Sequence, residues 1–288
     1  MSESATVRDL TSHREPMALT LTTPRGDVHR LVYAFDRTSP VQHAMRTLVD
    51  AGEFYEPETT ILLASVLKPG DTFVDVGAHV GYFTVLAAAL VGSAGQVVSF
   101  EPEPGNYAQL VEHIRLNGYS QVLPIHCAAG VVEGVRDLHC NADNDGGHAL
   151  WDVRRHPYNQ RSRAAPRTHA VFVSTLDRVL GNVATGRIKA IKIDVEGNEH
   201  DVLRGARQML ERHCVPFVIA EVNRMGLEQA GSSQAALRAF MTMLGYECWL
   251  LQTAEPQLVR VEAGQEVVTT DGDGVFNLLF RRPGAVIG

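Results

Sequence analysis

The sequence predicts an α/β fold, a doubly wound and mostly parallel sheet of seven strands with an antiparallel edge strand. Three observations lead to this prediction. A β-forming run, residues 72–76, is followed by Gly77 and Gly81 and then by a helical apolar pattern. Strand and helix patterns alternate through residue 252. A DGDG turn, residues 271–274, then returns the chain into a last strand that must run antiparallel to its neighbour.

Length and composition favour one elaborated domain over two, since 288 residues with 45% hydrophobic content can bury one substantial core. The net charge of −7 argues against general binding to nucleic acid or to an anionic membrane. The N-terminus has no export-like stretch and no apolar run is long enough to span a bilayer, so we expect a cytoplasmic protein. The cysteines form no C-x-x-C pair, and homo-oligomer formation stays open.

The glycine turn after residue 76 is suited to a nucleotide. Gly77 and Gly81 lack Cβ atoms, so backbone N–H groups and a helix N-terminus can approach a ligand closely. A dinucleotide fingerprint would need glycines at the positions of His79 and Tyr82, which argues against a nicotinamide dehydrogenase. Glu101 ends the second strand, 26 residues beyond Asp75, where an acidic side chain can bind both ribose hydroxyls.

Four motifs in order, DVGAHVGYFT, FEPEPGNYAQLVEHIRLNG, STLDRVL and IKAIKIDVEGNEHDVLRGA, resemble the FkbM family of S-adenosylmethionine-dependent methyltransferases over residues 54–223. The resemblance implies a class I methyltransferase (Rossmann-like) fold, S-adenosylmethionine as cofactor and a hydroxyl on a sugar or polyketide natural product as acceptor. His79 stands where the family usually has Asn. We expect the cofactor site to comprise Asp75, Gly77, His79, Gly81, Tyr82, Glu101, Pro102, Asn106, Cys127, Ala128 and Asp194.

A second chemical centre is predicted at the ends of two later strands. Asp194 follows the strand 188–193 and should face the Gly77 turn, while Glu221 and Asn223 end the next strand. Asp194, Glu221 and Asn223 could bind Mg²⁺ through oxygen, but no metal-binding spacing is present, so we favour hydrogen-bonding roles. Candidate catalytic bases are Asp194, His148, His200 and Glu221.

We divide the chain into an N-terminal hairpin and helical cap, residues 1–70, and a methyltransferase domain, residues 71–288, with an inserted lid at about 141–170. Residues 154–169 hold five arginines and two histidines without an acid. This basic segment is either a lid for an anionic small-molecule acceptor or a solvated loop. Residues 54–56 are interpreted as packing, with acceptor contact as the alternative. N- or carboxyl-methylation of a small molecule or peptide, or a silent cofactor-binding module, remain alternatives to O-methylation.

Overall fold

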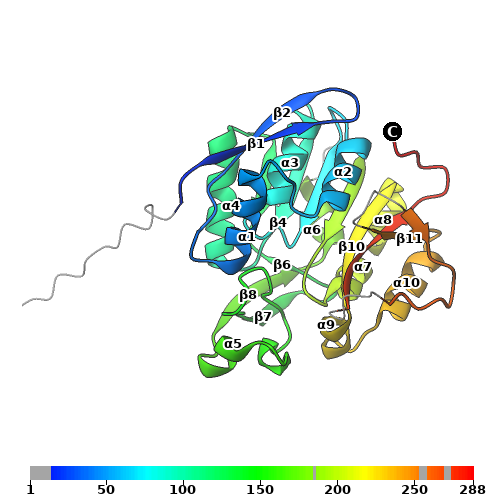
Figure 1. Ribbon diagram of the computed structural model, residues 1–288. Helices are drawn as coiled ribbons and strands as arrows, with labels where there is room; N and C mark the ends of the chain where they lie inside the picture. The colour runs from blue at the N-terminus through cyan, green and yellow to red at the C-terminus, as the bar shows by residue number, and fades with distance from the viewer. Residues whose placement is uncertain (1–13, 184–185, 253–257, 269–273) are drawn as a thin grey trace, which may run out of the picture.

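The protein is built on one eight-stranded sheet with the strand order β12-β11-β13-β10-β9-β3-β4-β5. The computed structural model describes residues 14–183, 186–252, 258–268 and 274–288 (Figure 1). The strands are β3 (Thr72–Val76), β4 (Gln96–Phe100), β5 (Val122–Ile125), β9 (Ile188–Ile193), β10 (Phe217–Asn223), β11 (Glu247–Leu251), β12 (Leu258–Arg260) and β13 (Val275–Arg281). From β5 to β10 all neighbours are parallel, whereas β13 runs antiparallel to both β10 and β11. The α/β class and the mostly parallel sheet are confirmed.

Helices cover both faces of this sheet. One face packs against α2 (Pro57–Val66), α3 (Tyr82–Val91) and α4 (Pro104–Asn117). The other packs against α6 (Leu176–Val183), α7 (Glu199–Arg204), α8 (Arg207–His213), α9 (Arg224–Gln229) and α10 (Gln234–Met243). Successive residues of the central strand β3 alternate between the faces, so that Phe73 joins one buried core and Val74 the other. Among the described residues, none of the helices has the length and apolar character needed to cross a membrane.

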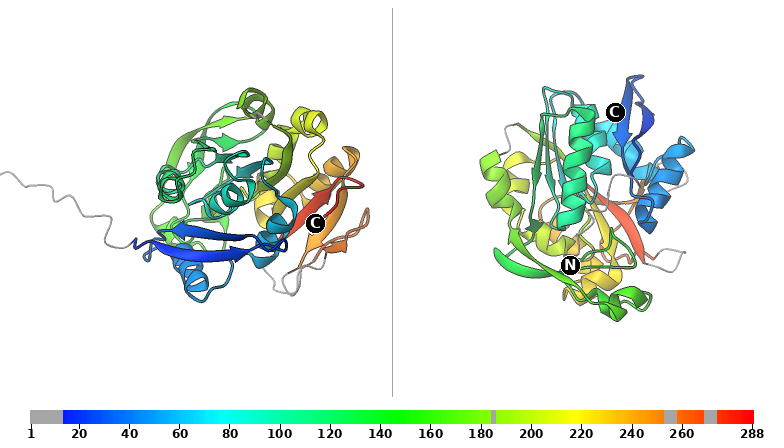
Figure 2. Two further views of the ribbon diagram at one scale, coloured as in Figure 1. Left: turned by 90° about the horizontal axis from the view of Figure 1, so that it is seen from above. Right: turned by 90° about the vertical axis from the view of Figure 1, so that its left-hand side faces the viewer.

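The N-terminal part forms the predicted hairpin and helices. Strands β1 (Met17–Thr22) and β2 (Val28–Tyr33) pair antiparallel and lie over α3 and α4 (Figure 2). Helix α1 (Pro40–Asp50) starts as expected, since Ser39 caps it by accepting a hydrogen bond from the backbone N–H of Gln42.

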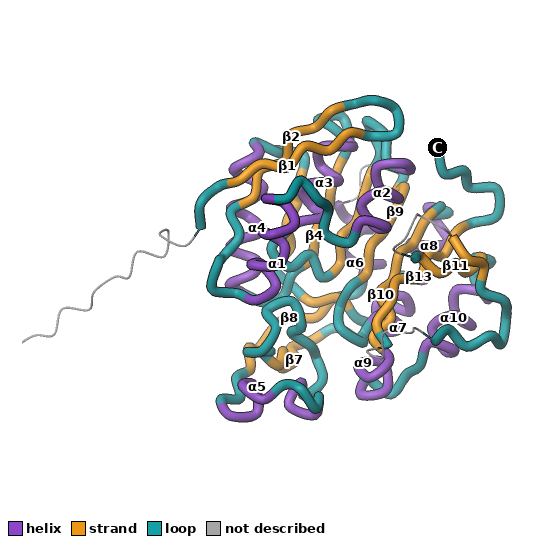
Figure 3. The backbone as a smooth tube through the Cα atoms, viewed as in Figure 1, coloured by secondary structure: helices purple, strands orange, loops and turns teal. Residues whose placement is uncertain are grey.

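A second, three-stranded sheet is inserted between β5 and β9. It joins β6 (Ala128–Ala129), β8 (Thr168–Ser174) and β7 (Gly134–His139), and between β7 and β8 lie a 3₁₀ turn (Val153–Arg155) and α5 (Gln160–Ala164). Figure 3 shows this sheet and α5 at the opposite end of the molecule from the β1–β2 hairpin. The expected strand over residues 121–130 is therefore split, with β5 in the main sheet and β6 in the insertion.

Three further details differ from the prediction. Strand β12, three residues without a readable pattern, makes the sheet eight-stranded and forms the antiparallel edge. The single helix expected after β9 is broken into α7 and α8 at Gly205, where the Gly205 carbonyl accepts the backbone N–H of Asp177 and the Asp177 carboxylate accepts the N–H groups of Gln208 and Met209 at the start of α8. Helix α9 was not predicted. Apart from Gly274, the turn expected at 271–274 lies outside the described residues.

Candidate active site

The site forms where the strand order reverses, at the carboxyl ends of β3 and β9. Gly77, with φ +82°, ends β3 so close to the next strand that a Cβ there would lie 1.7 Å from the carbonyl oxygen of Asp194. The backbone N–H of Asp194 donates to the carbonyl of Val76 at 2.9 Å. Asp194 therefore lies across from the glycine turn, as the sequence predicted, and the close approach requires glycine at position 77.

A first cavity, with about 540 Å³ of empty space including its open mouth, lies beside this junction. Its wall contains eight of the predicted cofactor residues: Gly77, His79, Glu101, Pro102, Asn106, Cys127, Ala128 and Asp194. Phe100, Leu138 and Leu150 add apolar surface. The cavity thus combines an apolar wall for a flat ring with polar groups at the strand ends.

Glu101 fits a ribose-binding role. Its side chain is buried, and its two oxygens accept backbone N–H groups of His79 and Glu103, each at 2.8 Å. Burial raises the pKa of this carboxyl to about 8. Each oxygen keeps a second lone pair, so the carboxylate can still accept hydrogen bonds from a vicinal diol. These residues fit S-adenosylmethionine, whose ribose would lie on Glu101.

Three of the predicted cofactor residues do not line the first cavity. The Asp75 carboxylate is buried below the turn and accepts from the Thr84 hydroxyl at 2.6 Å. Gly81 starts α3, where a Cβ would lie 2.5 Å from a methyl carbon of Leu110. Tyr82 faces a different cavity. Their direct contact with the cofactor stays a prediction, and in the structure these positions shape the turn and the helix start beneath the cavity.

A second cavity adjoins the first. The two share Gly77, His79, Gly146, Asp194 and Glu196 in their walls. The remaining wall of the second cavity is apolar, aromatic and acidic: Val41, Met45, Tyr55, Glu56, Ala78, Tyr82, Phe83, Asn144, Lys192 and Glu221. Tyr55 and Glu56, interpreted from the sequence as packing residues, therefore reach this cavity.

Carboxyl groups gather around one buried lysine at the floor of the second cavity. The Lys192 ammonium lies 2.7 Å from Asp194 Oδ2, 3.7 Å from Glu56 Oε1 and 4.6 Å from the centre of the Phe83 ring. Burial raises the pKa of Glu56 and, aided by repulsion from Asp194 and Glu196, raises that of Glu221 well above its usual range. The cluster is thus a strongly interacting set of acids with a resident cation.

Glu196 was missed by the sequence analysis and occupies the junction of the two cavities. It has a positive φ of 56°, which is uncommon for a residue with a side chain. Its carboxyl accepts from the Asn223 amide at 2.8 Å, and its backbone carbonyl accepts from the Trp151 indole at 2.6 Å. Burial, with repulsion from Asp194, raises the pKa of Glu196 to about 7. A carboxyl with this pKa can accept a proton near neutral pH.

The two histidines proposed as bases lie elsewhere. His148 lines the first cavity but not the second, and its Nδ1 accepts the backbone N–H of Asn141 at 2.9 Å. His200, on α7, contacts the Ser232 hydroxyl at 2.7 Å and the ring of Phe240, and it lines neither cavity. The role of His200 as a base stays a prediction that neither cavity supports, because its face of α7 turns toward α10.

The predicted metal set does not fit Mg²⁺. Asp194, Glu196 and Glu221 place carboxyl oxygens within 4.8 Å of one another, but Asn223 donates its amide to Glu196 and caps α9 with its oxygen. Lys192 already holds Asp194. The Asn223 side-chain oxygen already accepts the backbone N–H of Gly226, so Asn223 acts as a hydrogen-bonding group and not as a metal ligand.

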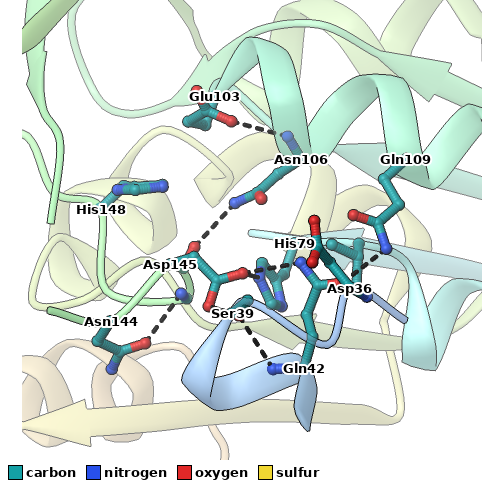
Figure 4. Close-up of polar contacts among 12 residues, drawn as sticks. Asp36, Ser39, Gln42, His79, Glu103, Asn106, Gln109, Asn144, Asp145 and His148 are labelled. Carbon is teal, nitrogen blue, oxygen red and sulfur yellow. Dashed lines mark hydrogen bonds and ion pairs between the residues drawn. The ribbon is translucent and has the colours of Figure 1, made fainter. Parts of the chain in front are cut away.

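The glycine-rich loop 141–150 covers both cavities. Figure 4 shows Asp145 of this loop between His79 of the turn and Ser39 and Gln42 at the start of α1. Its carboxylate accepts from the Ser39 hydroxyl, from the Gln42 amide at 2.8 Å and from His79 Nε2 at 3.4 Å. Burial opposes ionisation, yet the hydrogen bonds from His79, Ser39 and Gln42 hold the pKa of Asp145 well below its usual range. The loop is therefore tied to the cap.

The arginines of the basic segment lie away from these cavities. Arg154 pairs with Asp152 at 2.7 Å, Arg155 donates to Gln229 at 2.8 Å, and Arg163 donates to backbone carbonyls. None of the segment's arginines lines either cavity in the described part of the chain. Binding of an anionic acceptor by this segment stays a prediction, and no contact between its arginines and either cavity supports it.

Fold and site together define an α/β protein with a nucleoside-cofactor cavity opening onto a second cavity. The family model described as the methyltransferase FkbM domain matches residues 75–248. The chain belongs to this family, which confirms the resemblance seen in its motifs.

Two characterised proteins are similar to part of the chain. Methyltransferase 1 of Beauveria bassiana is 28% identical over 151 residues, covering 48% of this chain and 59% of that protein. The AMB antimetabolite synthetase AmbE of Pseudomonas aeruginosa is 30% identical over 168 residues, covering 49% of this chain and 8% of the synthetase. The chain thus spans less than two thirds of the length of each of these two relatives.

Among solved structures, methyltransferase FkbM from Methylobacillus flagellatus is 16% identical, with a TM-score of 0.43, and the match covers 83% of this chain and 58% of that chain. A SAM-dependent O-methyltransferase from Thermotoga maritima is 12% identical, with a TM-score of 0.42, and the match covers 91% and 77%.

Proposed function

We propose that the chain transfers the methyl group of S-adenosylmethionine to a hydroxyl of a small-molecule acceptor, such as a sugar or polyketide natural product. One observation carries the proposal. The cavity that suits the cofactor and the cavity lined by carboxyl groups share Asp194 and Glu196 in their walls. A methyl group carried at this junction would face an acceptor in the second cavity.

The chain's residues divide the work by position. Glu101 holds the ribose, and the apolar wall of the first cavity receives the adenine. The bound cofactor supplies an electrophilic methyl group on a sulfonium. Transfer to an oxygen in line with that group requires mainly positioning, with reacting atoms about 3 to 3.5 Å apart.

Glu196 is suited to take the hydroxyl proton. It lies at the junction, and its pKa of about 7 leaves much of it ionised at neutral pH. Asn223 holds the carboxyl in place through one oxygen, leaving the other for the acceptor. Such proton transfer contributes about 10²- to 10⁴-fold to a rate. Asp194, with one oxygen bound by Lys192, forms the opposite wall.

Transfer of a ¹³C-methyl label tests the proposal. The protein is incubated with S-adenosylmethionine labelled at its methyl group and with a panel of sugars, polyketide alcohols, amines and carboxylic acids. The methyl carbon's chemical shift distinguishes an ether from an amine or an ester. We expect ether products. Label confined to nitrogen or to esters would replace O-methylation with one of those reactions, and cofactor binding without transfer to any acceptor would indicate a silent module.

A further inference from the structure

The second cavity holds more carboxyl groups than cations. Four acidic side chains line it, namely Glu56, Asp194, Glu196 and Glu221, while Lys192 is the one lysine or arginine among the described residues of its wall. Lys192 is shared between Asp194 and Glu56. The cavity therefore holds more ionisable carboxyl groups than one resident ammonium can balance.

Glu221 differs from the other three acids in its hydrogen-bond partners. Glu56 also accepts from the Thr59 hydroxyl and the Asn277 amide, each at 3.1 Å, and Glu196 accepts from Asn223. Asp194 and Glu196 line both cavities and would face the sulfonium charge of a bound cofactor. Glu221 lines the second cavity alone, and no side chain in the described part of the protein donates a hydrogen bond to it.

This leaves a half-buried carboxyl aimed at the space where the acceptor must lie. Its ionised form is opposed by burial and by the neighbouring Asp194 and Glu196. A positive charge on the acceptor would reverse that balance, since a charge-assisted hydrogen bond favours the carboxylate.

The other walls of the cavity favour an organic cation over a metal. The partly exposed Tyr55 ring lines it and packs edge-to-face on the buried Tyr82, whose own ring stacks on Tyr33. Val41 and Met45 of α1 add apolar surface. Aromatic faces attract alkylammonium groups, whereas Mg²⁺ completes its octahedral shell with water, for which aromatic and apolar walls offer no partner. The Lys192 ammonium against Phe83 shows the same pairing already present in the cavity.

We infer that the acceptor carries an ammonium group beside the hydroxyl to be methylated, and that Glu221 binds this ammonium beside the Tyr55 ring. An amino sugar or another amino alcohol has this chemistry. The inference rests on the proposed function in placing the acceptor in the second cavity. It assigns Glu221 to acceptor recognition. It also gives the acceptor a positive charge, whereas the basic segment 154–169 had suggested an anionic acceptor.

Matched acceptors test the inference. Methyl glucoside is compared with its derivatives in which one hydroxyl at a time is replaced by an amine, and with the N-acetyl form of each. Binding to protein loaded with S-adenosylhomocysteine is measured by calorimetry, and transfer is measured with the ¹³C-methyl label. We expect at least one amine to bind about tenfold more tightly than the parent glucoside, because one charge-assisted hydrogen bond is added, and N-acetylation to remove the gain.

Variants of Glu221 identify the group responsible. Glu221→Gln should abolish the tenfold preference for the amine, while Glu221→Asp, which keeps the charge, should retain part of it. Glu53→Gln is the matched control, since Glu53 is exposed and does not line the cavity. Binding of S-adenosylhomocysteine and a thermal melt check that each variant is folded. The preference of the wild-type protein for the amine over the parent glucoside does not depend on any variant, so it tests the inference even if a variant fails to fold.

The outcomes separate this inference from the proposed function. Equal binding of amine and parent, or an unchanged preference in Glu221→Gln, overturns the ammonium site even if ether products form. A preference for the amine with label on nitrogen supports the ammonium site and overturns O-methylation. If the parent glucoside binds only when Mg²⁺ is added, and no amine is preferred, the carboxyl cluster binds a metal and the inference is overturned.

Discussion

Replacing Glu101 with glutamine should weaken binding of the nucleoside part of the cofactor with little change in the size of the side chain. In the wild type both oxygens already accept a backbone N–H at 2.8 Å, and both would accept a ribose hydroxyl. A glutamine side chain has one oxygen that can still accept, but its NH₂ group would face the backbone N–H of His79 or Glu103, which is also a donor. Hydrogen bonds to a charged group are worth about 1.5 to 3 kcal/mol each. Above about pH 8, where Glu101 is ionised, we therefore expect a loss of about 2 to 4 kcal/mol, or roughly thirty- to thousandfold in affinity.

Calorimetry with adenosine isolates this contact, because adenosine has the ribose but not the titrating amino acid part of the cofactor. The 2′-deoxy and 3′-deoxy analogues should each bind the wild type more weakly than adenosine and should bind Glu101→Gln nearly as well as adenosine does. Glu112→Gln is the control, since Glu112 lies further along α4 and lines neither cavity.

The pH dependence gives a second test of the same contact. Since burial raises the pKa of Glu101 to about 8, the free protein holds a proton there at neutral pH, and ribose hydroxyls bind best to the ionised form. Adenosine affinity should therefore rise with pH and level off above about pH 8, and this part of the rise should vanish in Glu101→Gln. Equal affinity and an equal pH profile in the two proteins would refute the ribose assignment.

Four other perturbations follow from the site. Glu196→Gln should lower kcat by about 10²-fold or more with cofactor affinity nearly unchanged, and wild-type kcat should rise with pH through about 7 because the base must be ionised; a wild-type pH profile without that rise would exclude Glu196. Lys192→Met should cost about 3 to 5 kcal/mol of unfolding free energy in urea, since it leaves buried carboxylates unpaired. Asp145→Asn should be less stable than the wild type at pH 7, and the gap should close as the pH falls below 3.8 and through the lowered pKa of Asp145, because only the ionised carboxylate is stabilised; a pH-independent gap would contradict this. Excess chelator should leave turnover unchanged, since Lys192 already binds Asp194, and loss restored by Mg²⁺ would show a metal requirement.

The parts of the site that the sequence predicted depend on local geometry. A strand, a glycine turn and a helix in succession place Gly77 at a strand end, and the parallel sheet then brings Asp194 to the same edge. Glu101 follows from the same reasoning, since it directly succeeds the next strand. These positions are set by chain direction alone, so the pattern of apolar residues was sufficient.

The parts that were missed depend on tertiary contacts. Glu196 stands three residues beyond the end of β9, in a turn with positive φ, so that strand alternation does not give its direction. Helices α7 and α8 separate at Gly205, and the start of α8 is capped by the carboxylate of Asp177 from a different helix, α6. Asp145 acts through Ser39 and His79, which lie far from it in sequence. Contacts between residues far apart in the chain cannot be predicted from hydrophobic periodicity or from motif spacing.

A crystal structure of the protein with S-adenosylhomocysteine tests the central claim most directly, namely that cofactor and acceptor meet at the junction of two cavities. We predict the ribose hydroxyls within hydrogen-bonding distance of Glu101, and the sulfur at the wall that contains Asp194 and Glu196, facing the second cavity. A ligand whose sulfur faces solvent, or whose ribose lies away from Glu101, would contradict the account.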